Sequence, residues 1–325
     1  MTDDRATPLL DMPALARRCG VQRVLLKAEN ERALGNFKSL GGAAAVERML
    51  RQRDWPNGGA ARLLCASDGN HGLAVAVAAR RFGVSARVYL PASIERWRIE
   101  RIEREQAEVI LVNGSYDDGV ACAHAASRAG EGRLVADTSD DANDETVRAV
   151  MDGYRSVARE VDEQLKAANL PRPTHLFVQA GVGGFAAAMV AGLKATGMHD
   201  FRMVVVEPQA AACVAAALAA GRVVQIQGDL RTCAGMLSCG RASASALATL
   251  LAHSARSTLV DETQLVAAPE ILKEQGIVTT PSGAAGLAGL IEASSDAEFK
   301  RSIALDERSS VLLFATEAGR ELRTS

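Results

Sequence analysis

The chain has 325 residues, a length that suits one large domain or two closely packed ones. Its 37 Lys and Arg residues nearly balance 39 Asp and Glu residues, so the net charge of −2 provides no general attraction to nucleic acid or to an anionic membrane. Hydrophobic residues make up 48% and charged residues 23%, which are ordinary globular values and exclude wholesale disorder. Aromatic residues are only 4%, so we expect a core built mainly from Ala, Val and Leu.

Strand-like and helix-like patterns alternate along most of the chain. In the first half, they predict strands at 23–27, 62–65, 87–90 and 108–112 and helices at 72–82, 95–104 and 118–128. In the second half, they predict strands at 175–179, 203–206 and 311–315 and helices at 145–168 and 185–195. This alternation predicts an α/β fold of parallel-type sheets flanked by helices, with ligands bound at the carboxyl ends of the strands.

The segment 176–193 carries no charge and is just long enough to span a membrane. It contains Gln179 and four glycines and begins like a strand, so we interpret it as strand, turn and helix. The N-terminal sequence MTDDRATPLL is acidic and lacks the apolar core of a signal peptide. We therefore expect a soluble, cytoplasmic protein that binds neither nucleic acid nor a membrane.

Six cysteines are scattered along the chain, without a CxxC pair or a His–Cys cluster at zinc spacing. Such isolated cysteines usually act as small buried hydrophobic residues. We therefore expect no metal site built from them.

A lysine in a glycine-flanked loop is the first candidate for chemistry. The sequence GNFKSLGG at residues 35–42 places Lys38 at the start of an Ala-rich helical run. A lysine held in a desolvated loop can lose its proton and attack a carbonyl group, forming a Schiff base. Taken alone, the segment favours a solvated lysine at a helix N-terminus, although a cation there opposes the helix dipole.

Two loops that follow expected strands carry further candidates. The sequence SDGNHG at 67–72 is either an ordinary turn or a set of hydrogen-bonding groups aimed at a ligand, and His71 is its weakest member. The sequence QAGVGG at 179–184 can cradle a phosphate with its backbone N–H groups. Its glycine spacing falls short of GxGxxG and it lacks a P-loop lysine, so a single monophosphate fits best. Glu207, as a possible ribose partner, keeps a dinucleotide site as a weaker alternative.

Hydroxyl groups stand at two later expected strand or helix ends. The sequence TPSGAAG at 280–286 contains Ser282, and FATE at 314–317 contains Thr316. Such residues often serve only as caps, so these segments alone leave their role open.

In this chain order, the lysine loop, the polar turn and the glycine-rich turn resemble fold-type II pyridoxal 5′-phosphate (PLP) enzymes, such as threonine dehydratases and tryptophan synthase β chains. Within this group the sequence most resembles the diaminopropionate ammonia-lyase family. The segments that carry the resemblance are NFKSLGG at 36–42, SDGNHG at 67–72, YDD at 116–118, ADT at 136–138, QAGVG at 179–183, VEP at 206–208 and AGMLSCG at 234–240. The likeness extends from about Thr7 to Gly319.

The resemblance implies a role for each matching residue. Lys38 would hold PLP as a Schiff base, and Asn70 would contact the cofactor's phenolic oxygen. The phosphate would be bound at Gly181, Val182, Gly183 and Gly184. Thr316 is the first choice for the partner of the pyridine nitrogen, and Ser282 is the second.

The same resemblance makes Asp68 the informative catalytic residue. Dehydratases and racemases of the group carry a small or hydroxyl residue there, beside the cofactor face opposite the lysine. A carboxylate can act as general base for an α-proton that Lys38 cannot reach, or pair with a second ammonium group of the substrate. Lys38 and Asp68 on opposite faces would let one site accept both enantiomers. Asp137 resembles a second acidic residue that assists the same proton transfer.

The reaction implied is the PLP-dependent α,β-elimination of D- or L-2,3-diaminopropionate, or both, to pyruvate and ammonia. The amine leaves readily only when protonated, so an acid must stand near the β-carbon. One alternative is a PLP-dependent dehydratase for serine, threonine or 3-hydroxyaspartate. Another is a PLP- or amino-acid-binding protein without turnover. The family is usually dimeric, so the resemblance also implies a homodimer.

The sequence departs from the family at two segments. An aromatic-containing loop of the family is replaced by SDDAND at 139–144, which we interpret as a solvated loop ahead of a helix. If it lined the site instead, it would favour a cationic substrate or a bound cation. Thr280 and Pro281 stand where many relatives have a glutamate. These departures bear on the substrate more than on the cofactor.

We expect a two-subdomain fold-type II architecture. The larger, PLP-binding subdomain would comprise residues 1–50 and 141–325. The smaller subdomain would comprise residues 51–140.

Overall fold

The computed structural model describes residues 5–52, 61–67, 69–114 and 116–319. The chain forms two compact units, each with its own sheet. The larger unit comprises Met1–Phe37 and Arg155–Ser325, and the smaller unit comprises Lys38–Tyr154. The smaller unit is therefore an insertion in the sequence of the larger one.

The larger unit is built on a six-stranded sheet with the strand order β1-β2-β10-β7-β8-β9. The strands are β1 (Leu9–Asp11), β2 (Arg23–Lys27), β7 (His175–Gln179), β8 (Arg202–Pro208), β9 (Arg256–Val260) and β10 (Ser310–Phe314). The pair β1 and β2 is antiparallel, and the other neighbours are parallel. Strands β7 and β10 are buried along their whole length, which explains their continuous apolar sequences.

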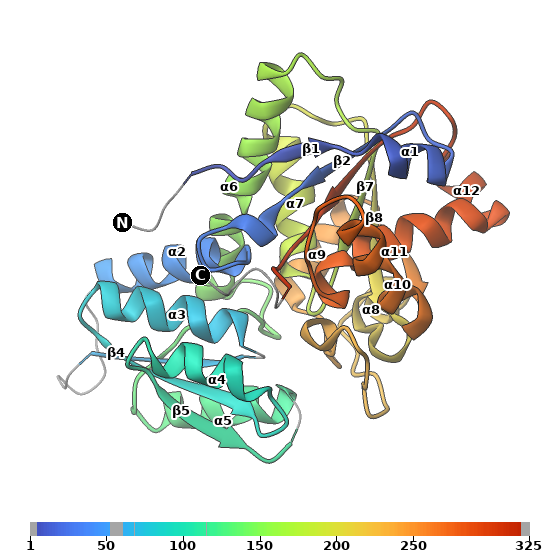
Figure 1. Cartoon of the computed structure of the whole chain (residues 1–325). Helices are drawn as coiled ribbons and strands as arrows, with labels where there is room; N and C mark the ends of the chain where they lie inside the picture. The colour runs from blue at the N-terminus through green and yellow to red at the C-terminus, as the bar shows by residue number, and fades with distance from the viewer. Residues whose placement is uncertain (1–4, 53–60, 68, 115, 320–325) are drawn as a thin grey trace. The chain divides into compact units, whose positions relative to one another are not determined.

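Helices flank the sheet of the larger unit (Figure 1). The helices of the larger unit are α1 (Pro13–Cys19), α6 (Glu145–Ala167), α7 (Gly184–Ala195), α8 (Cys213–Ala220), α9 (Ala244–Ala252), α10 (Glu262–Lys273), α11 (Pro281–Ser295) and α12 (Ala297–Ser302), with the 3-10 helices η1 (Glu29–Glu31), η3 (Gln209–Ala211) and η4 (Gly235–Leu237). Of these, α1, α7, α8 and α11 pack directly on the strands. Helix α6 begins in the smaller unit and ends in the larger one. Helix α11 packs across β7, β8, β9 and β10.

The core of the larger unit is aliphatic, as the low aromatic content predicts. Branched side chains of the sheet, such as Val24, Val204 and Leu313, are fully buried against small residues of α11, such as Ala285 and Ala288. Small helix residues let α11 approach the sheet closely, which favours dense packing.

The smaller unit is built on a four-stranded parallel sheet with the order β5-β4-β3-β6. The strands are β3 (Arg62–Ala66), β4 (Ser85–Pro91), β5 (Glu108–Val112) and β6 (Arg133–Leu134), and the helices are α2 (Lys38–Arg51), α3 (Asn70–Arg81), α4 (Arg96–Glu103) and α5 (Tyr116–Arg128). Helices α3 and α5 pack on β3 and β4, and α2 packs on α3. The carboxyl end of β3 and the start of α5 contribute side chains to the site described below.

The predicted fold class is confirmed: parallel sheets flanked by helices carry both units. Each predicted strand and helix overlaps an observed one, and the segment 176–193 forms β7, a turn and most of α7. The compact units change at Lys38 and Arg155, whereas the subdomain boundaries expected from the sequence lie at 51 and 141; the latter remain a prediction. Helix α2 belongs to the smaller unit because it packs on α3.

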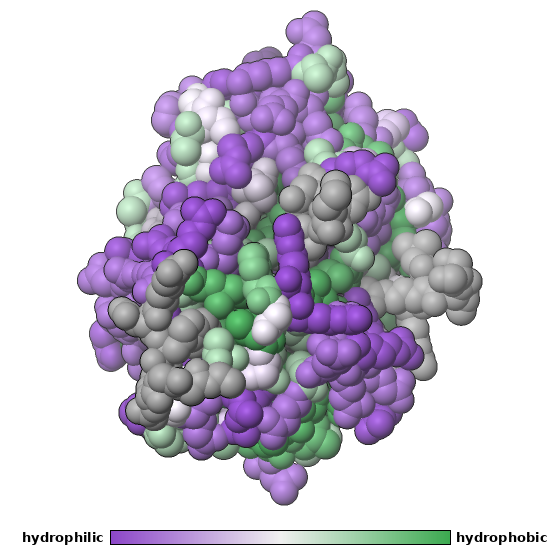
Figure 2. All heavy atoms as spheres, turned by 90° about the vertical axis from the view of Figure 1, so that its left-hand side faces the viewer, coloured by the Kyte–Doolittle hydropathy of each residue, from purple (hydrophilic) through white to green (hydrophobic). Residues whose placement is uncertain are grey.

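The surface shows the polar character that the composition predicts. Hydrophilic residues cover most of the face seen in Figure 2, and hydrophobic residues gather in smaller areas between them. Across the described ranges, no helix is both long and apolar enough to cross a bilayer.

Candidate active site

The smaller unit pairs the candidate lysine with the candidate aspartate. Lys38 is the first residue of α2, and its Nζ lies 2.8 Å from Oδ2 of Asp137. The Lys38 side chain is 26% exposed, whereas that of Asp137 is 7% exposed. The lysine is therefore accessible on one side and ion-paired on the other, which is not the solvated lysine that its segment alone favours.

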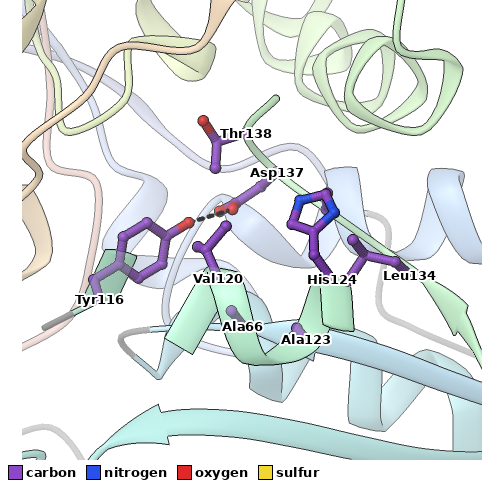
Figure 3. A pocket seen from close by; sticks show the side chains of 9 residues that line it. Ala66, Tyr116, Val120, Ala123, His124, Leu134, Asp137 and Thr138 are labelled. Carbon is purple, nitrogen blue, oxygen red and sulfur yellow. Dashed lines mark hydrogen bonds between the residues drawn. The ribbon is translucent and has the colours of Figure 1, made fainter. Parts of the chain in front are cut away.

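Asp137 is held in its ionised form by neighbours on both oxygens. Tyr116, at the start of α5, donates its hydroxyl to Oδ1 at 2.8 Å (Figure 3). Burial by itself raises the pKa of the Asp137 carboxyl, but the Lys38 ammonium, His71 and the hydrogen bonds from Lys38 and Tyr116 together hold that pKa well below its usual range. The carboxylate stays charged across the neutral range, so it anchors a cation rather than donating a proton.

The polar turn after β3 is built by a serine. Ser67 Oγ accepts hydrogen bonds from the N–H groups of Gly69 and Gly72, each at 2.8 Å. This arrangement fixes the start of α3, whose first residue, Asn70, is buried. Asp68 lies outside the described residues.

His71 is a packed residue, as expected. It is fully buried, and its Nε2 donates to the backbone oxygen of Val135 at 2.8 Å. Burial lowers the pKa of its imidazole. A neutral ring that bridges α3 to the segment before Asp137 supports the position of that aspartate.

A small pocket lies against the Asp137 side of this cluster (Figure 3). Small or aliphatic residues from β3, α5 and β6 form most of its wall, and His124, Thr138 and the Tyr116–Asp137 pair add polar groups. Its lining residues are Ala66, Tyr116, Val120, Ala123, His124, Leu134, Ala136, Asp137 and Thr138. The apolar wall shields Asp137 from water and strengthens its ionic contacts.

In the larger unit, the glycine-rich turn between β7 and α7 presents uncapped amides. Gly183 has φ +91°, a left-handed conformation that glycine adopts without strain, and α7 begins directly after it without a side-chain cap. Within the described part of the chain, the N–H groups of residues 181–184 have no hydrogen-bond acceptor. These amides and the helix dipole form a site suited to a phosphate.

Hydrogen bonds to two carbonyl groups of the 181–184 turn fix its conformation. Cys213 donates its thiol to the Gly181 oxygen at 3.3 Å, and the Ser243 amide donates to the Val182 oxygen at 2.9 Å. The carbonyls are thus engaged while the amides are left for an anion.

The two candidate hydroxyl groups lie in one buried cluster with Gln179, the last residue of β7. Gln179 Nε2 lies 3.0 Å from Thr316 Oγ1, 2.8 Å from the Gly283 oxygen and 3.2 Å from the Ser282 oxygen. The Ser282 hydroxyl accepts from the Met236 amide at 3.1 Å. Thr280, by contrast, acts as a plain cap for α11, accepting from the Gly283 amide at 3.0 Å.

Glu207 is not available to a ribose. Its two oxygens accept from the Val214 and Ala215 amides, each at 2.7 Å, so it caps α8 from the end of β8. Burial raises the pKa of the Glu207 carboxyl to about 8, although the two amides act in the opposite direction. The dinucleotide interpretation thereby loses its acidic partner.

The loop at 139–144 behaves as a solvated loop. Asp140, Asp141 and Asn143 are exposed. Asp144 accepts from the Thr146 and Val147 amides at 2.9 and 3.0 Å and so starts α6. In the described ranges, no group of three or more His, Cys, Asp or Glu residues is arranged to hold a metal ion.

Comparison with known families decides the class of protein. The family described as pyridoxal-phosphate dependent enzymes matches residues 2–316. The chain belongs to this family. As a PLP-dependent enzyme it uses pyridoxal 5′-phosphate as its cofactor.

Two curated relatives and one solved structure show which kinds of PLP-dependent enzyme this chain is similar to. It is 30% identical to the diaminopropionate ammonia-lyase of Salmonella typhimurium, over 96% of this chain and 84% of that protein. It is also 30% identical to human serine dehydratase-like, over 87% and 81% of the two chains. The structure of Escherichia coli diaminopropionate ammonia lyase with an aminoacrylate-PLP azomethine reaction intermediate matches with a TM-score of 0.89 at 26% identity, covering 99% of this chain and 87% of that one.

The residues present in this PLP-dependent enzyme suit its cofactor. PLP offers an aldehyde, a phosphate and a pyridine nitrogen, and this chain has a reachable lysine, four uncapped amides and a buried hydroxyl. Sequence reasoning assigned no role to Tyr116 or Gln179, which contact Asp137 and Thr316. The sequence marks these two residues only weakly: Tyr116 precedes two aspartates, and Gln179 is the polar residue that ends an apolar strand.

Proposed function

We propose that this PLP-dependent enzyme is an ammonia-lyase that converts 2,3-diaminopropionate to pyruvate and ammonia. The observation that carries the proposal is the ion pair of Lys38 with the buried Asp137, whose carboxyl has a lowered pKa. A lyase that expels an amine must have a proton available near the leaving group, and Asp137 would stabilise that proton on Lys38 Nζ once the substrate has released this amine from the cofactor. The similarity to the Salmonella ammonia-lyase over nearly the whole chain supports the same substrate.

We assign the cofactor contacts as follows. Lys38 is the residue of covalent attachment, and Asn70 contacts the phenolic oxygen. The amides of Gly181, Val182, Gly183 and Gly184 bind the phosphate. Thr316 is the partner of the pyridine nitrogen, with Ser282 as the second choice. Bound PLP supplies an electron sink for the negative charge that develops at the substrate α-carbon.

The chain's own groups then move the protons. Lys38, once its amine is free, takes the α-proton from one face of the substrate and holds it as an ammonium ion beside Asp137. Asp137 cannot donate a proton because its carboxyl stays ionised, so Lys38 is the proton donor to the departing amine. Asp68 is the proposed base for the opposite enantiomer, and its carboxylate also attracts the second ammonium group of diaminopropionate.

The runner-up is a dehydratase that acts on a hydroxy amino acid. The human serine dehydratase-like relative favours it, since its identity to this chain equals that of the ammonia-lyase. Both reactions share the elimination logic and differ in the leaving group, which is water rather than an amine.

The deciding experiment measures pyruvate and ammonia from D- and L-2,3-diaminopropionate, with serine and threonine alongside, using PLP-loaded protein. We expect turnover of diaminopropionate, at least about a hundredfold faster than of serine. Faster turnover of serine or threonine assigns the chain to the dehydratases. Absence of keto acid from all four substrates contradicts the ammonia-lyase and the serine or threonine dehydratase, and means either a different substrate or a PLP-binding protein without turnover.

The stereochemical part of the proposal has its own test. Asp68→Asn removes one base and leaves Lys38 in place, so one enantiomer of diaminopropionate should lose about a hundredfold in kcat while the other loses little. Asp200→Asn, at an exposed aspartate of the larger unit, is the control. Equal losses for both enantiomers would contradict two separate bases.

We also propose a cytoplasmic homodimer. The family resemblance supports both features. Sedimentation equilibrium of the PLP-loaded chain should give twice the mass of one chain, and a monomer at micromolar concentration would contradict it.

A further inference from the structure

A single glutamine connects three segments of the larger unit around Thr316. Gln179 is 3% exposed, and its Nε2 lies within hydrogen-bond distance of four oxygens. Two are at the start of α11, on Ser282 and Gly283, and two are at the end of β10, on Phe314 and Thr316. The side-chain amide nitrogen of Gln179 has two protons to donate, and all four of these neighbouring oxygens can accept them.

The surroundings fix which way the Gln179 amide points. A flipped amide would set its oxygen among four oxygens, so the nitrogen must face them. The Gln179 oxygen has no hydrogen-bond partner and lies beside Gly286, where an added Cβ would be only 2.9 Å away. Glycine at that position leaves the room in which the carboxamide sits.

This orientation sets the polarity of the Thr316 hydroxyl. An amide N–H₂ donates and cannot accept, so Thr316 Oγ1 must be the acceptor in the 3.0 Å contact. The hydroxyl proton therefore points away from Gln179. Among the described residues it meets no other acceptor, and Thr316 is only 5% exposed.

We propose that Gln179 is a positioning residue that turns the Thr316 hydroxyl into a hydrogen-bond donor toward the pyridine nitrogen of PLP and so keeps that nitrogen unprotonated. The inference rests on the role proposed above for Thr316. A donor pointing at the ring nitrogen matches only a nitrogen that carries a lone pair. Such a ring withdraws electrons less strongly than a protonated one, which suits elimination of a leaving group over prolonged stabilisation of charge on the ring.

Removal of the carboxamide should reverse the hydroxyl. In Gln179→Met the oxygens of Gly283 and Phe314 lose their donor and become acceptors for the Thr316 proton. The hydroxyl then turns its lone pair toward the ring, and a protonated pyridine nitrogen becomes the better partner. The effect reaches the cofactor through Thr316 alone.

The test uses PLP with an isotope-labelled ring nitrogen, bound to the full chain. In the wild type we expect the nitrogen NMR shift of an unprotonated ring, and in Gln179→Met a move toward the protonated value. The dissociation constant of PLP should rise about threefold to tenfold, the effect of one lost hydrogen bond. The double variant Thr316→Val with Gln179→Met should have the same nitrogen NMR shift as Thr316→Val alone.

Controls separate this inference from the function on which it rests. Gln264→Met removes a glutamine from the cap of α10, away from Thr316, and should leave the ring shift unchanged. Gly286→Ala keeps Gln179, but its added Cβ would lie 2.9 Å from the Gln179 oxygen and 3.0 Å from the Phe177 backbone oxygen, so it displaces the carboxamide, crowds β7 and should give a smaller move in the same direction. Gln179→Leu replaces Gln179→Met if that variant fails to fold. A wild-type shift in both Gln179→Met and Gly286→Ala, with a changed shift in Thr316→Val, overturns the role of Gln179. An unchanged shift in Thr316→Val overturns the role of Thr316 instead, whatever the substrate assay shows.

Discussion

The two units of this PLP-dependent enzyme contribute opposite kinds of polar group. The cluster of the smaller unit is ionic: Lys38 Nζ and the Tyr116 hydroxyl each lie 2.8 Å from an oxygen of Asp137. The cluster of the larger unit is neutral, made of the Gln179 amide, backbone oxygens and the Thr316 hydroxyl.

This difference divides the work of a cofactor enzyme. Ionic groups can hold and move protons, whereas neutral dipoles can orient a ring and a phosphate without titrating near neutral pH. We therefore expect substitutions in the ionic cluster to change rate and pH dependence strongly. Substitutions in the neutral cluster should mainly change the affinity and electronic state of the cofactor.

The largest expected effect follows from Lys38→Ala. This change removes the amine that we propose for covalent attachment and for proton transfer, so turnover should fall at least about a thousandfold. Borohydride reduction and mass spectrometry of the peptides should find no PLP adduct. Lys166→Ala, which removes a surface lysine paired with Asp162, is the control and should keep the adduct. An adduct in Lys38→Ala would contradict the assignment.

Asp137→Asn should rank second. It keeps the size of the side chain but leaves the Lys38 ammonium without its counter-charge, so kcat should fall about a hundredfold. The folded-state pKa of Asp137 is lowered, so its carboxylate stabilises the fold above about pH 4, and that stabilisation disappears as the solution becomes more acidic. Urea unfolding should show this gain between about pH 2 and pH 7 in the wild type and not in the variant. Equal gains in both would contradict the ion pair.

Tyr116→Phe should have a smaller effect of the same kind. It deletes one hydrogen bond to Asp137 and keeps the ring, so kcat should fall about threefold to tenfold. Loss of the hydroxyl removes one of the groups that lower the pKa of Asp137, so the loss of stability in acid should begin at a higher pH. Tyr89→Phe, on strand β4, is the control. It should leave kcat unchanged if the effect comes from the Tyr116 hydroxyl in particular.

Glu207→Gln should affect activity least and pH-dependent stability most clearly. The raised pKa of Glu207, about 8, means that the folded state binds a proton that the unfolded state releases. Its contribution to stability is therefore complete below about pH 4.5 and is lost as pH rises through about 8. The free energy of unfolding of Glu207→Gln should vary less over this window. If the free energy of unfolding varies with pH as much in the variant as in the wild type, or more, the group that titrates in this window is not Glu207.

Much of the fold could be predicted because buried parallel strands have continuous apolar sequences. The predicted strands at 175–179 and 23–27 coincide with β7 and β2. Strands β1 and β6 are only three and two residues long, too short for a periodic signal. Helix α11 was predicted only as a segment with hydroxyl groups, because its glycines lower helix propensity and tertiary packing overrides that preference.

The site was less predictable than the fold. Lys38 and Asp137 are separated by 99 positions, and nothing in either segment alone pairs them. The family resemblance selected both residues, and the structure shows that they touch. Tyr116 and Gln179 act through other side chains, so their roles depend on three-dimensional neighbours that spacing cannot reveal.

The insertion of one unit within the other has a consequence for synthesis of the chain. The smaller unit is the continuous segment Lys38–Tyr154, so all its contacts can form once Tyr154 has left the ribosome. Strand β2 must wait for β10, near the end of the chain, before its parallel neighbour exists. We therefore expect the smaller unit to fold first during translation, while one edge of β2 stays unpaired until β10 has emerged.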